Sequence, residues 1–240
     1  MTPWVQRLLI ANVLMYFVTQ TASPGLMGAL EFVPAYILVR PWTIITYMFL
    51  HQGLMHIFFN MLVLYFFGPR VEQRLGSERF FVLYFISGIA GALLSFAFAP
   101  YAAVVGASGA IFGVELAYAR FYPRDQIYVW GIIPVEVRVL VGISTLIALF
   151  GGLSGGGGVA HFAHLGGFVG AFLYLLFLER RHGAKQFKRQ ATALPATVDA
   201  TLGNWKKVDR GSVHSVNKDE VNRILDKISA SGIGSLTPQE

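Results

Sequence analysis

Cysteine is absent from this 240-residue sequence, and charged residues are scarce. The absence of cysteine excludes disulfide bonds and thiolate metal sites, although it says little about the compartment of a membrane protein. Charged residues make up 13% of the chain, against about a quarter in soluble domains, whereas 55% of the residues are hydrophobic. This composition excludes an ordinary soluble domain and indicates a polytopic membrane protein.

Acidic residues are especially rare in the first three quarters of the chain. Only six of the 13 acidic residues precede Glu179. The formal net charge of +6 could suggest a nucleic-acid partner, but the basic residues lie where membrane topology requires them. We therefore expect membrane lipids, and no nucleic acid, to be the partner of these charges.

Six apolar stretches are each near the roughly 20 residues that cross a bilayer. They lie at about 5–18, 54–67, 80–98, 107–121, 135–149 and 159–178. The connection between the first two stretches is long, rich in aromatic and apolar residues, and interrupted by three prolines. We expect this connection to lie in the membrane interface. The sequence thus predicts an all-α, polytopic membrane protein, a bundle of six transmembrane helices with a long interfacial first loop.

The distribution of Lys and Arg predicts the orientation of the spans, because cytoplasmic loops carry the excess. The loops after the second and fourth spans hold three arginines each, and the tail from Arg180 onward holds eleven basic residues. The loops on the opposite side hold only Arg40. Both termini are therefore predicted to be cytoplasmic.

The part of the chain after the last span is polar and is predicted to lie outside the membrane. Residues 180–215 are basic and aperiodic, as in a linker over anionic headgroups. Residues 216–240 begin with a helix-cap pattern, followed by apolar residues at helical spacing and a stop at Gly232. The predicted organisation is a membrane core at 1–179, a basic cytoplasmic linker at 180–215 and a short amphipathic helix and tail at 216–240.

Two polar residues in apolar segments could carry chemistry. Ser108 opens the fourth span, and His164 lies in the sixth. A polar group is costly in a bilayer, and a hydroxyl beside an imidazole is the pair that acyl transfer needs. The alternative for a lone serine is close helix packing, with its hydroxyl bonded to its own helix. Free amides at the start of the serine helix could stabilise an oxyanion, which favours a nucleophile.

Glycines would allow the serine and histidine helices to approach each other. Gly109 and Gly113 form a small-residue face on the fourth span, and Gly166 and Gly170 form a similar face on the sixth. These small residues could let the two helices approach closely and so bring the hydroxyl and the imidazole together.

Other polar residues could assist this pair. His161 is one turn from His164 and is the alternative base, but it would lie nearer the loop and water. His56 and Asn60 share one face of the second span, so both could donate to an oxyanion, and interhelical hydrogen bonds are their alternative role. Glu115 lies seven residues beyond the serine, roughly 10 Å along the helix, so a dyad is predicted and not a triad.

A metal site is the competing use of four histidines, His51, His56, His161 and His164. Two histidines on one helix face can bind one ion. No HExxH motif occurs, however, and no carboxylate stands beside either histidine pair to act as a base. We therefore expect no metal and no other cofactor.

Four sequence blocks together resemble the rhomboid family of intramembrane serine proteases, in its bacterial six-span type. They are 51–60 with its LMHIFFN core, 68–77 (GPRVEQRLGS), 106–109 (GASG) and 163–167 (AHLGG). Each block alone is weak, but all four in this order are specific. The resemblance covers about 42–179, and it implies a location in the bacterial inner (plasma) membrane.

The resemblance implies a role for each site residue. Ser108 would be the nucleophile and His164 the general base. His56 and Asn60, together with the Ser108 amide, would stabilise the oxyanion. Phe112 would take the place of an aromatic residue that packs near the catalytic histidine.

The resemblance also bears on residues away from the site. Glu72 and Arg74 would belong to a structural polar network at the cytoplasmic end of the second span. The family's Trp-Arg pair in the first loop appears here as Trp42 and Thr43, with an arginine at Arg40 instead.

The sequence therefore predicts an intramembrane serine endopeptidase that acts through a Ser-His dyad and an acyl-enzyme. Its substrates would be transmembrane proteins, cleaved in or near their membrane spans. A catalytically inactive rhomboid-like protein that binds membrane clients is the alternative with the same fold. A small-molecule transporter would show inverted repeats or ionisable residues in mid-span, and Glu115 alone is thin support for that class.

Overall fold

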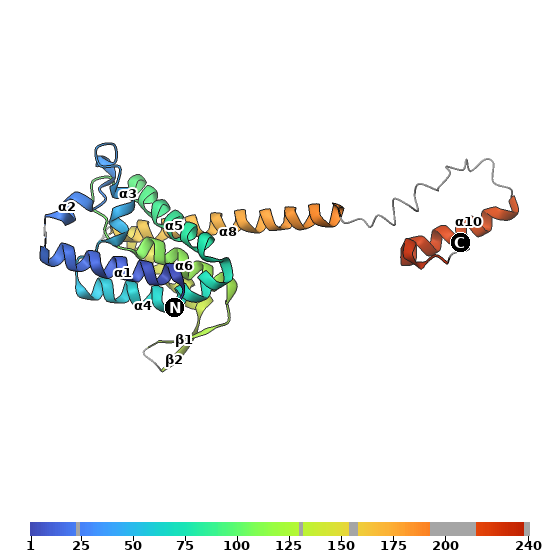
Figure 1. Cartoon of the computed structure of the whole chain (residues 1–240), viewed down its shortest axis with the longest axis horizontal. Coiled ribbons are helices and arrows are strands. Elements are labelled where there is room, and N and C mark those ends of the chain that lie inside the picture. The colour runs from blue at the N-terminus through green and yellow to red at the C-terminus, as the bar shows by residue number, and fades with distance from the viewer. Residues whose placement is uncertain (23–24, 130–131, 154–157, 193–214, 238–240) are drawn as a thin grey trace. The chain divides into compact units, whose positions relative to one another are not determined.

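The computed structural model describes the chain except for residues 23–24, 130–131, 154–157, 193–214 and 238–240. The chain forms two compact units, Met1–Gly183 and Ala184–Glu240. Helices dominate both units (Figure 1). Most of the predicted basic linker, 180–215, lies outside the described residues, but its first part is helical and not aperiodic, because α8 (Gly158–Thr192) continues through it.

The first unit is a bundle of apolar helices, and each predicted apolar stretch coincides with one of them. These helices are α1 (Pro3–Phe17), α4 (Leu54–Leu75), α5 (Ser77–Phe98), α6 (Ser108–Phe121), α7 (Val137–Leu153) and α8 (Gly158–Thr192). Within the described chain, Leu54–Leu75, Ser77–Phe98 and His161–Arg181 are long and apolar enough to cross a membrane, and Val137–Ile147 is a shorter apolar helix.

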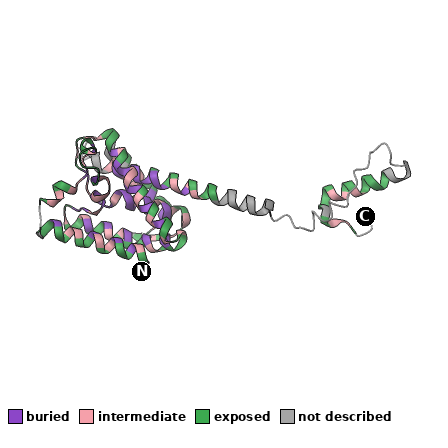
Figure 2. Cartoon of the chain, turned by 45° about the horizontal axis from the view of Figure 1, so that its top comes forward, coloured by how far each residue is buried: buried purple, intermediate pink, exposed green. Residues whose placement is uncertain are grey.

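The outer faces of these helices carry large apolar side chains. Figure 2 shows buried residues on the inward faces of the bundle and exposed residues on its outward faces. Leu14, Phe66, Leu93 and Ile147 are among the exposed apolar side chains. Such faces suit hydrocarbon and not water. The protein is therefore an integral, multi-pass membrane protein.

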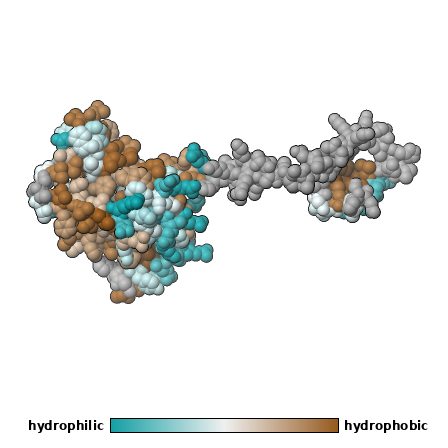
Figure 3. All heavy atoms as spheres, in the orientation of Figure 1, coloured by the Kyte–Doolittle hydropathy of each residue, from teal (hydrophilic) through white to brown (hydrophobic). Residues whose placement is uncertain are grey.

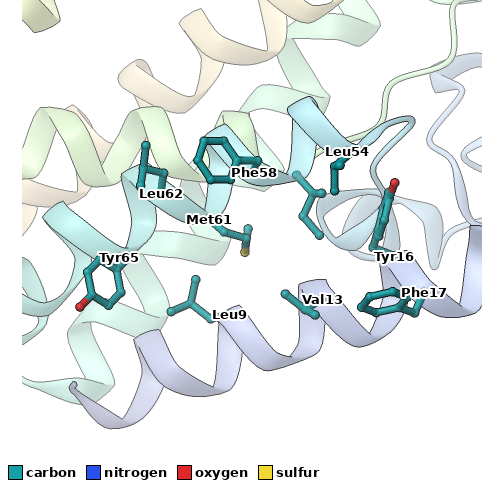
Figure 4. Close-up of a pocket in the computed structure, with 10 residues that line it drawn as sticks. Leu9, Val13, Tyr16, Phe17, Leu54, Phe58, Met61, Leu62 and Tyr65 are labelled. Carbon is teal, nitrogen blue, oxygen red and sulfur yellow. The ribbon is translucent and has the colours of Figure 1, made fainter. Parts of the chain in front are cut away.

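An apolar cavity of about 420 Å³ lies between α1 and α4. Leu9 and Val13 of α1 face Met61 and Tyr65 of α4 across it (Figure 4). Its lining side chains are aliphatic or aromatic, and none is charged. This cavity therefore offers a surface for hydrocarbon, and no charged group lines it.

Helix α4 is longer than the sequence predicted. The second apolar stretch is predicted to end at about residue 67, before Gly68 and Pro69. The helix instead continues with Pro69 inside it and ends before Gly76, whose φ of 85° favours glycine. The additional two turns carry Arg70 and Arg74, and they extend the helix beyond its apolar part.

The long first connection folds into short helical turns and is held by hydrogen bonds. The turns are η1 (Val18–Ala22), α2 (Leu26–Leu30), η2 (Pro34–Tyr36), α3 (Thr43–Thr46) and η3 (Tyr47–Phe49). The Trp42 indole N–H donates to the carbonyl of Ala29 at 3.1 Å, and the Arg40 guanidinium donates to that of Gly28 at 2.8 Å. Arg40 thus anchors this loop, whereas the arginine of the family's Trp-Arg pair would stand at the position of Thr43.

Arg40→Ala is expected to loosen this loop while leaving the helices intact. The lost hydrogen bond is solvent-exposed, so we expect a cost of about 0.5–1.5 kcal/mol, or a fall of about 2–4 °C in the unfolding midpoint. Limited proteolysis of the protein in detergent should show faster cutting within residues 25–40. Equal cutting rates in Arg40→Ala and the unsubstituted protein would show that Arg40 does not anchor the loop.

A two-stranded antiparallel hairpin corrects the all-α prediction. Strands β1 (Gln126–Val129) and β2 (Ile133–Glu136) pair between α6 and α7, with Gln126 opposite Glu136. The sequence predicts a loop followed by a fifth span from about residue 135, with Pro134 between them. A two-stranded ribbon tolerates proline at an edge, and the β-branched residues around it favour pairing.

Polar contacts tie this hairpin to the helical core. Arg70 of α4 forms an ion pair with Asp125, and it donates to the Tyr118 hydroxyl at 2.7 Å. The Tyr118 hydroxyl in turn donates to Asp125 at 2.9 Å. The three side chains therefore join the end of α4, the last turn of α6 and the start of the hairpin.

The second unit contains the amphipathic helix that the sequence predicted. Helix α10 (Ser215–Ser231) ends before Gly232, whose φ is 77°, and η5 (Ile233–Ser235) follows it. A left-handed glycine is a common helix stop, so the predicted end is confirmed. Val221 and Leu225 lie exposed on one face of this helix.

Candidate active site

Ser108 and His164 meet across the interface between α6 and α8. The Nε2 atom of His164 lies 2.8 Å from the Oγ atom of Ser108, which is hydrogen-bonding distance. Ser108 is the first residue of α6, and His164 lies near the start of α8. The structure therefore brings together the two residues that the sequence singled out, although they are 56 positions apart.

A glycine contact sets the spacing of these two helices. A Cβ atom at Gly167 would overlap the carbonyl group of Gly109. A Cβ atom at Gly109 would lie 3.1 Å from the carbonyl oxygen of Ala163. The backbones of α6 and α8 thus touch next to the dyad, and side chains at these glycines would hold the helices apart.

The two helices approach closely, as expected, but the approach does not use Gly166 or Gly170. A Cβ atom at Gly166 would lie 2.6 Å from the Cα atom of Gly91, and one at Gly170 would lie 3.0 Å from the carbonyl oxygen of Ile86. Both neighbours belong to α5 (Ser77–Phe98). Helix α8 therefore uses adjacent glycines for two different partners, and Gly167 is the one that faces α6.

Phe112 fixes the orientation of the His164 ring. The two rings are stacked, with centroids 4.1 Å apart and planes 9° apart. Phe112 follows Ser108 by one helical turn, so one helix supplies both the hydroxyl and the surface on which the imidazole lies. This contact agrees with the packing that the resemblance implied.

His161 does not take the place of His164. Its ring centroid is 6.3 Å from that of His164, and its Nδ1 atom is buried without a hydrogen-bond partner among the described residues. Glu115 is also buried, and it lies seven residues after Ser108 in α6. The geometry is therefore that of a Ser-His dyad.

Gly106 shapes the approach to Ser108. Its φ of 121° is favoured only for glycine, and its N–H donates to the Tyr47 carbonyl at 2.9 Å. A Cβ atom at Gly106 would lie 2.7 Å from Nε2 of His56 and 3.7 Å from Oγ of Ser108. His56 and the Ser108 hydroxyl thus border the same small space beside this glycine.

The buried side-chain amide of Asn60 can still donate a hydrogen bond. It lies one turn after His56 in α4 and is 7% exposed. Its Nδ2 atom has no hydrogen-bond partner within the described chain. A buried amide N–H without a hydrogen-bond partner costs free energy. Such an unpaired donor is expected where the oxygen of a ligand binds.

Two further residues support this site: Tyr47, which sequence reasoning missed, and His51, which it considered only as a metal ligand. The Tyr47 hydroxyl donates to the Gly88 carbonyl at 2.7 Å, so Tyr47 links α5 to the segment before Ser108. His51 is fully buried, with its ring edge against His56 and the centroids 4.9 Å apart. Burial of the His51 ring and, to a smaller extent, electrostatic repulsion from His56 lower the pKa of His51 to about 3, so this ring is neutral. Among the residues described, no three His, Asp or Glu side chains converge as metal ligands.

The rhomboid family model, described as "Rhomboid domain", matches residues 38–181 of this chain. The match covers more than half of the sequence and includes every residue of the site. The chain belongs to the rhomboid family. A rhomboid domain implies a polytopic helical membrane fold, in agreement with the bundle of apolar helices.

Similar rhomboid proteins occur in a plant, an apicomplexan and a bacterium. RHOMBOID-like protein 2 of Arabidopsis thaliana is 35% identical over 159 residues, which are 65% of this chain and 49% of that protein. Rhomboid-like protease 3 of Toxoplasma gondii is 33% identical over 171 residues, 67% of this chain and 63% of that protein. Rhomboid protease GluP of Bacillus subtilis (strain 168) is 35% identical over 136 residues, 55% of this chain and 25% of that protein. This rhomboid chain thus spans less than two thirds of the length of each relative.

Glu72 and Arg74 of this rhomboid have separate surroundings. The Glu72 carboxylate accepts hydrogen bonds from the backbone N–H groups of Trp4 and Val5, both at 3.0 Å, and from the Ser77 hydroxyl at 2.7 Å. It therefore ties the start of α1 to the turn between α4 and α5. The Arg74 guanidinium lies instead near the ring of Phe121, so the expected shared network includes Glu72 but not Arg74.

Proposed function

We propose that this rhomboid is an intramembrane serine endopeptidase of the bacterial six-span type. The hydrogen bond of 2.8 Å between His164 Nε2 and Ser108 Oγ carries the proposal, because general-base activation of a serine requires this contact. The printed names of the Toxoplasma and Bacillus relatives, which describe proteases, support the same reaction class.

In the proposed mechanism His164 accepts the proton of Ser108 as Oγ attacks the scissile carbonyl carbon. The resulting oxyanion would receive hydrogen bonds from the Ser108 amide, His56 and Asn60. Collapse of the tetrahedral intermediate breaks the C–N bond, and His164 returns the proton to the leaving amine. A water molecule then attacks the acyl-enzyme in the same way and restores Ser108.

The substrate class follows from the membrane setting. A transmembrane helix keeps its carbonyl groups in hydrogen bonds, so the cleaved segment must be extended or easily unwound. We therefore propose transmembrane proteins with helix-weakening residues in or near the span as substrates. Membrane lipids are the other proposed partners, with no role for nucleic acid.

The proposed topology follows from the arginines. Ser108 begins α6 at the end of the bundle away from the arginine-bearing loops, and Phe121 ends it near Arg74. Under the positive-inside rule both termini would be cytoplasmic in the inner membrane, with the dyad nearer the outer side. The core at 1–179, the linker at 180–215 and the terminal helix at 216–240 would then be arranged in that order.

Cleavage of a single-span reporter by the purified full chain in liposomes tests this function. We expect two products, with a new terminus that mass spectrometry places in or near the reporter's span. A folded protein that binds the reporter and leaves it intact would support the inactive client-binding alternative instead.

His56→Ala is expected to lower kcat for the reporter about 10²–10³-fold, because one donor to the oxyanion is lost. KM should change little, since that interaction forms in the transition state. Steady-state kinetics of His56→Ala and Asn60→Ala would measure both effects. Gln52→Ala, an exposed polar residue of the adjoining loop, is the matched control. A change in KM alone at His56 would assign the residue to substrate binding.

A further inference from the structure

A second, basic cavity lies at the end of the bundle opposite the dyad. Its volume is about 260 Å³, and it opens where α4 ends, α5 begins and α6 ends against α8. Two arginines, Arg74 and Arg79, line it. The remaining wall is mostly apolar and consists of Leu75, Phe121, Leu175 and Leu178. Figure 3 shows hydrophilic residues gathered on the side of the bundle where α4 meets α5.

The positive charge of the arginines in this cavity is not neutralised by Glu179, the acidic residue in its lining. Glu179 is the one carboxylate in its lining, and the Arg120 guanidinium holds it through hydrogen bonds of 3.1 Å. Arg74 forms no ion pair with an acidic residue in the described part of the chain, and its guanidinium carbon lies 5.9 Å from the Phe121 ring centroid. The cavity thus presents a guanidinium group whose charge is available to an anion.

The combination of arginine and apolar walls indicates the chemistry of the ligand. Guanidinium groups bind phosphate oxygens through paired hydrogen bonds. The volume equals that of roughly nine water molecules at about 30 Å³ each, which is enough for a phosphate group with its neighbouring atoms. The four apolar side chains would favour a ligand that also carries hydrocarbon.

We propose that this cavity binds the phosphate of an anionic phospholipid, with Arg74 as the main contact. Basic pockets between transmembrane helices near the membrane surface recognise such headgroups. A bound lipid would connect the ends of four helices and stabilise the folded state in proportion to its occupancy. The proposal depends on membrane insertion, and it is independent of whether Ser108 acts as a nucleophile.

The unfolding midpoint of the full chain in an uncharged detergent tests lipid binding. Three ligands are compared at equal phosphate concentration: phosphatidylglycerol, phosphatidylcholine and inorganic phosphate. We expect a saturable rise in the midpoint with phosphatidylglycerol and little change with the other two. An equal rise with inorganic phosphate would assign the cavity to a soluble anion, and an equal rise with phosphatidylcholine would contradict recognition of the anionic headgroup.

Arg74→Ala is the decisive variant, and Arg124→Ala is its matched control. Arg124 lies exposed in the loop after α6 and does not line the cavity. Loss of Arg74 should raise the apparent dissociation constant for phosphatidylglycerol about tenfold, because a charge-assisted hydrogen bond is lost. Arg124→Ala should leave that constant unchanged, and Arg74→Lys should recover part of the affinity.

An equal loss of affinity in Arg74→Ala and Arg124→Ala would show diffuse attraction to basic residues and would overturn the proposal. If Arg74→Ala does not fold, Arg74→Gln, which keeps a polar side chain and removes the charge, takes its place with the same expected direction. Unaltered lipid binding in a folded Arg74→Gln protein would then contradict the assignment of this cavity.

Discussion

Replacement of either Ser108 or His164 by alanine is expected to reduce reporter cleavage at least about 10³-fold. The hydroxyl and the imidazole act as one unit, so removal of either should cost nearly as much as removal of both. The double variant should therefore be no slower than the slower single variant. Single-turnover rates in liposomes, measured with enzyme in excess, would make this comparison without interference from product release.

His161→Ala is the matched control for His164→Ala. Both residues are histidines of α8 one turn apart, but only His164 contacts Ser108. His161→Ala should keep most of the activity. All three single variants should still fold and show a cooperative unfolding transition, because none of these substitutions creates a steric clash. Cleavage that survives in both Ser108→Ala and His164→Ala would reject the assignment of the dyad.

Gly167→Ala is expected to abolish activity and to destabilise the bundle. The added methyl group would overlap the backbone carbonyl of Gly109, which cannot rotate away as a flexible side chain could. Overpacking of this kind costs about 1–3 kcal/mol. A shift of about 1 Å between α6 and α8 would also break the contact between Ser108 and His164, with at least about 10²-fold loss of rate.

Gly142→Ala is the matched control for this substitution. It is the same change in a helix of the same bundle, α7, where nothing lies within 4 Å of the added Cβ atom. Alanine is the better helix former, so this variant should be as stable as the unsubstituted protein or up to about 1 kcal/mol more stable. Normal activity and stability in Gly167→Ala would show that α6 and α8 do not approach as closely as the structure has them.

Much of the bundle could be predicted because membrane helices follow a simple composition rule. Every expected apolar stretch is a helix, and the fourth begins at Ser108, one residue from its predicted start. The contact between the hydroxyl and the imidazole could also be anticipated. Each is polar in an apolar segment, and glycines lie beside both.

The partners of individual glycines could not be predicted from spacing alone. Gly166 and Gly167 are neighbours in the sequence, yet one faces α5 and the other faces α6. A helical residue points about 100° away from the preceding one, so the choice depends on how α8 is rotated in the bundle. Only the packed structure sets that rotation.

The hairpin and the surroundings of Arg74 could not be predicted from the sequence for a different reason. Both depend on tertiary contacts at the polar end of the bundle. The sequence there has no regular spacing of apolar residues from which these contacts could be predicted. Arg70 joins the hairpin through Asp125, whereas Arg74, one turn later, lines a separate cavity. Arg70 and Arg74 are close in the sequence, but the position of α4 in the bundle gives them different surroundings.

Covalent labelling with a fluorophosphonate would show whether Ser108 is activated, because this probe reacts far faster with an activated serine than with an ordinary one. The full chain is labelled in detergent while folded, and the modified residue is found by peptide mass spectrometry. We expect one adduct, on Ser108, that disappears in His164→Ala while the protein stays folded. Labelling of another serine, or no labelling of folded protein, would contradict this expectation.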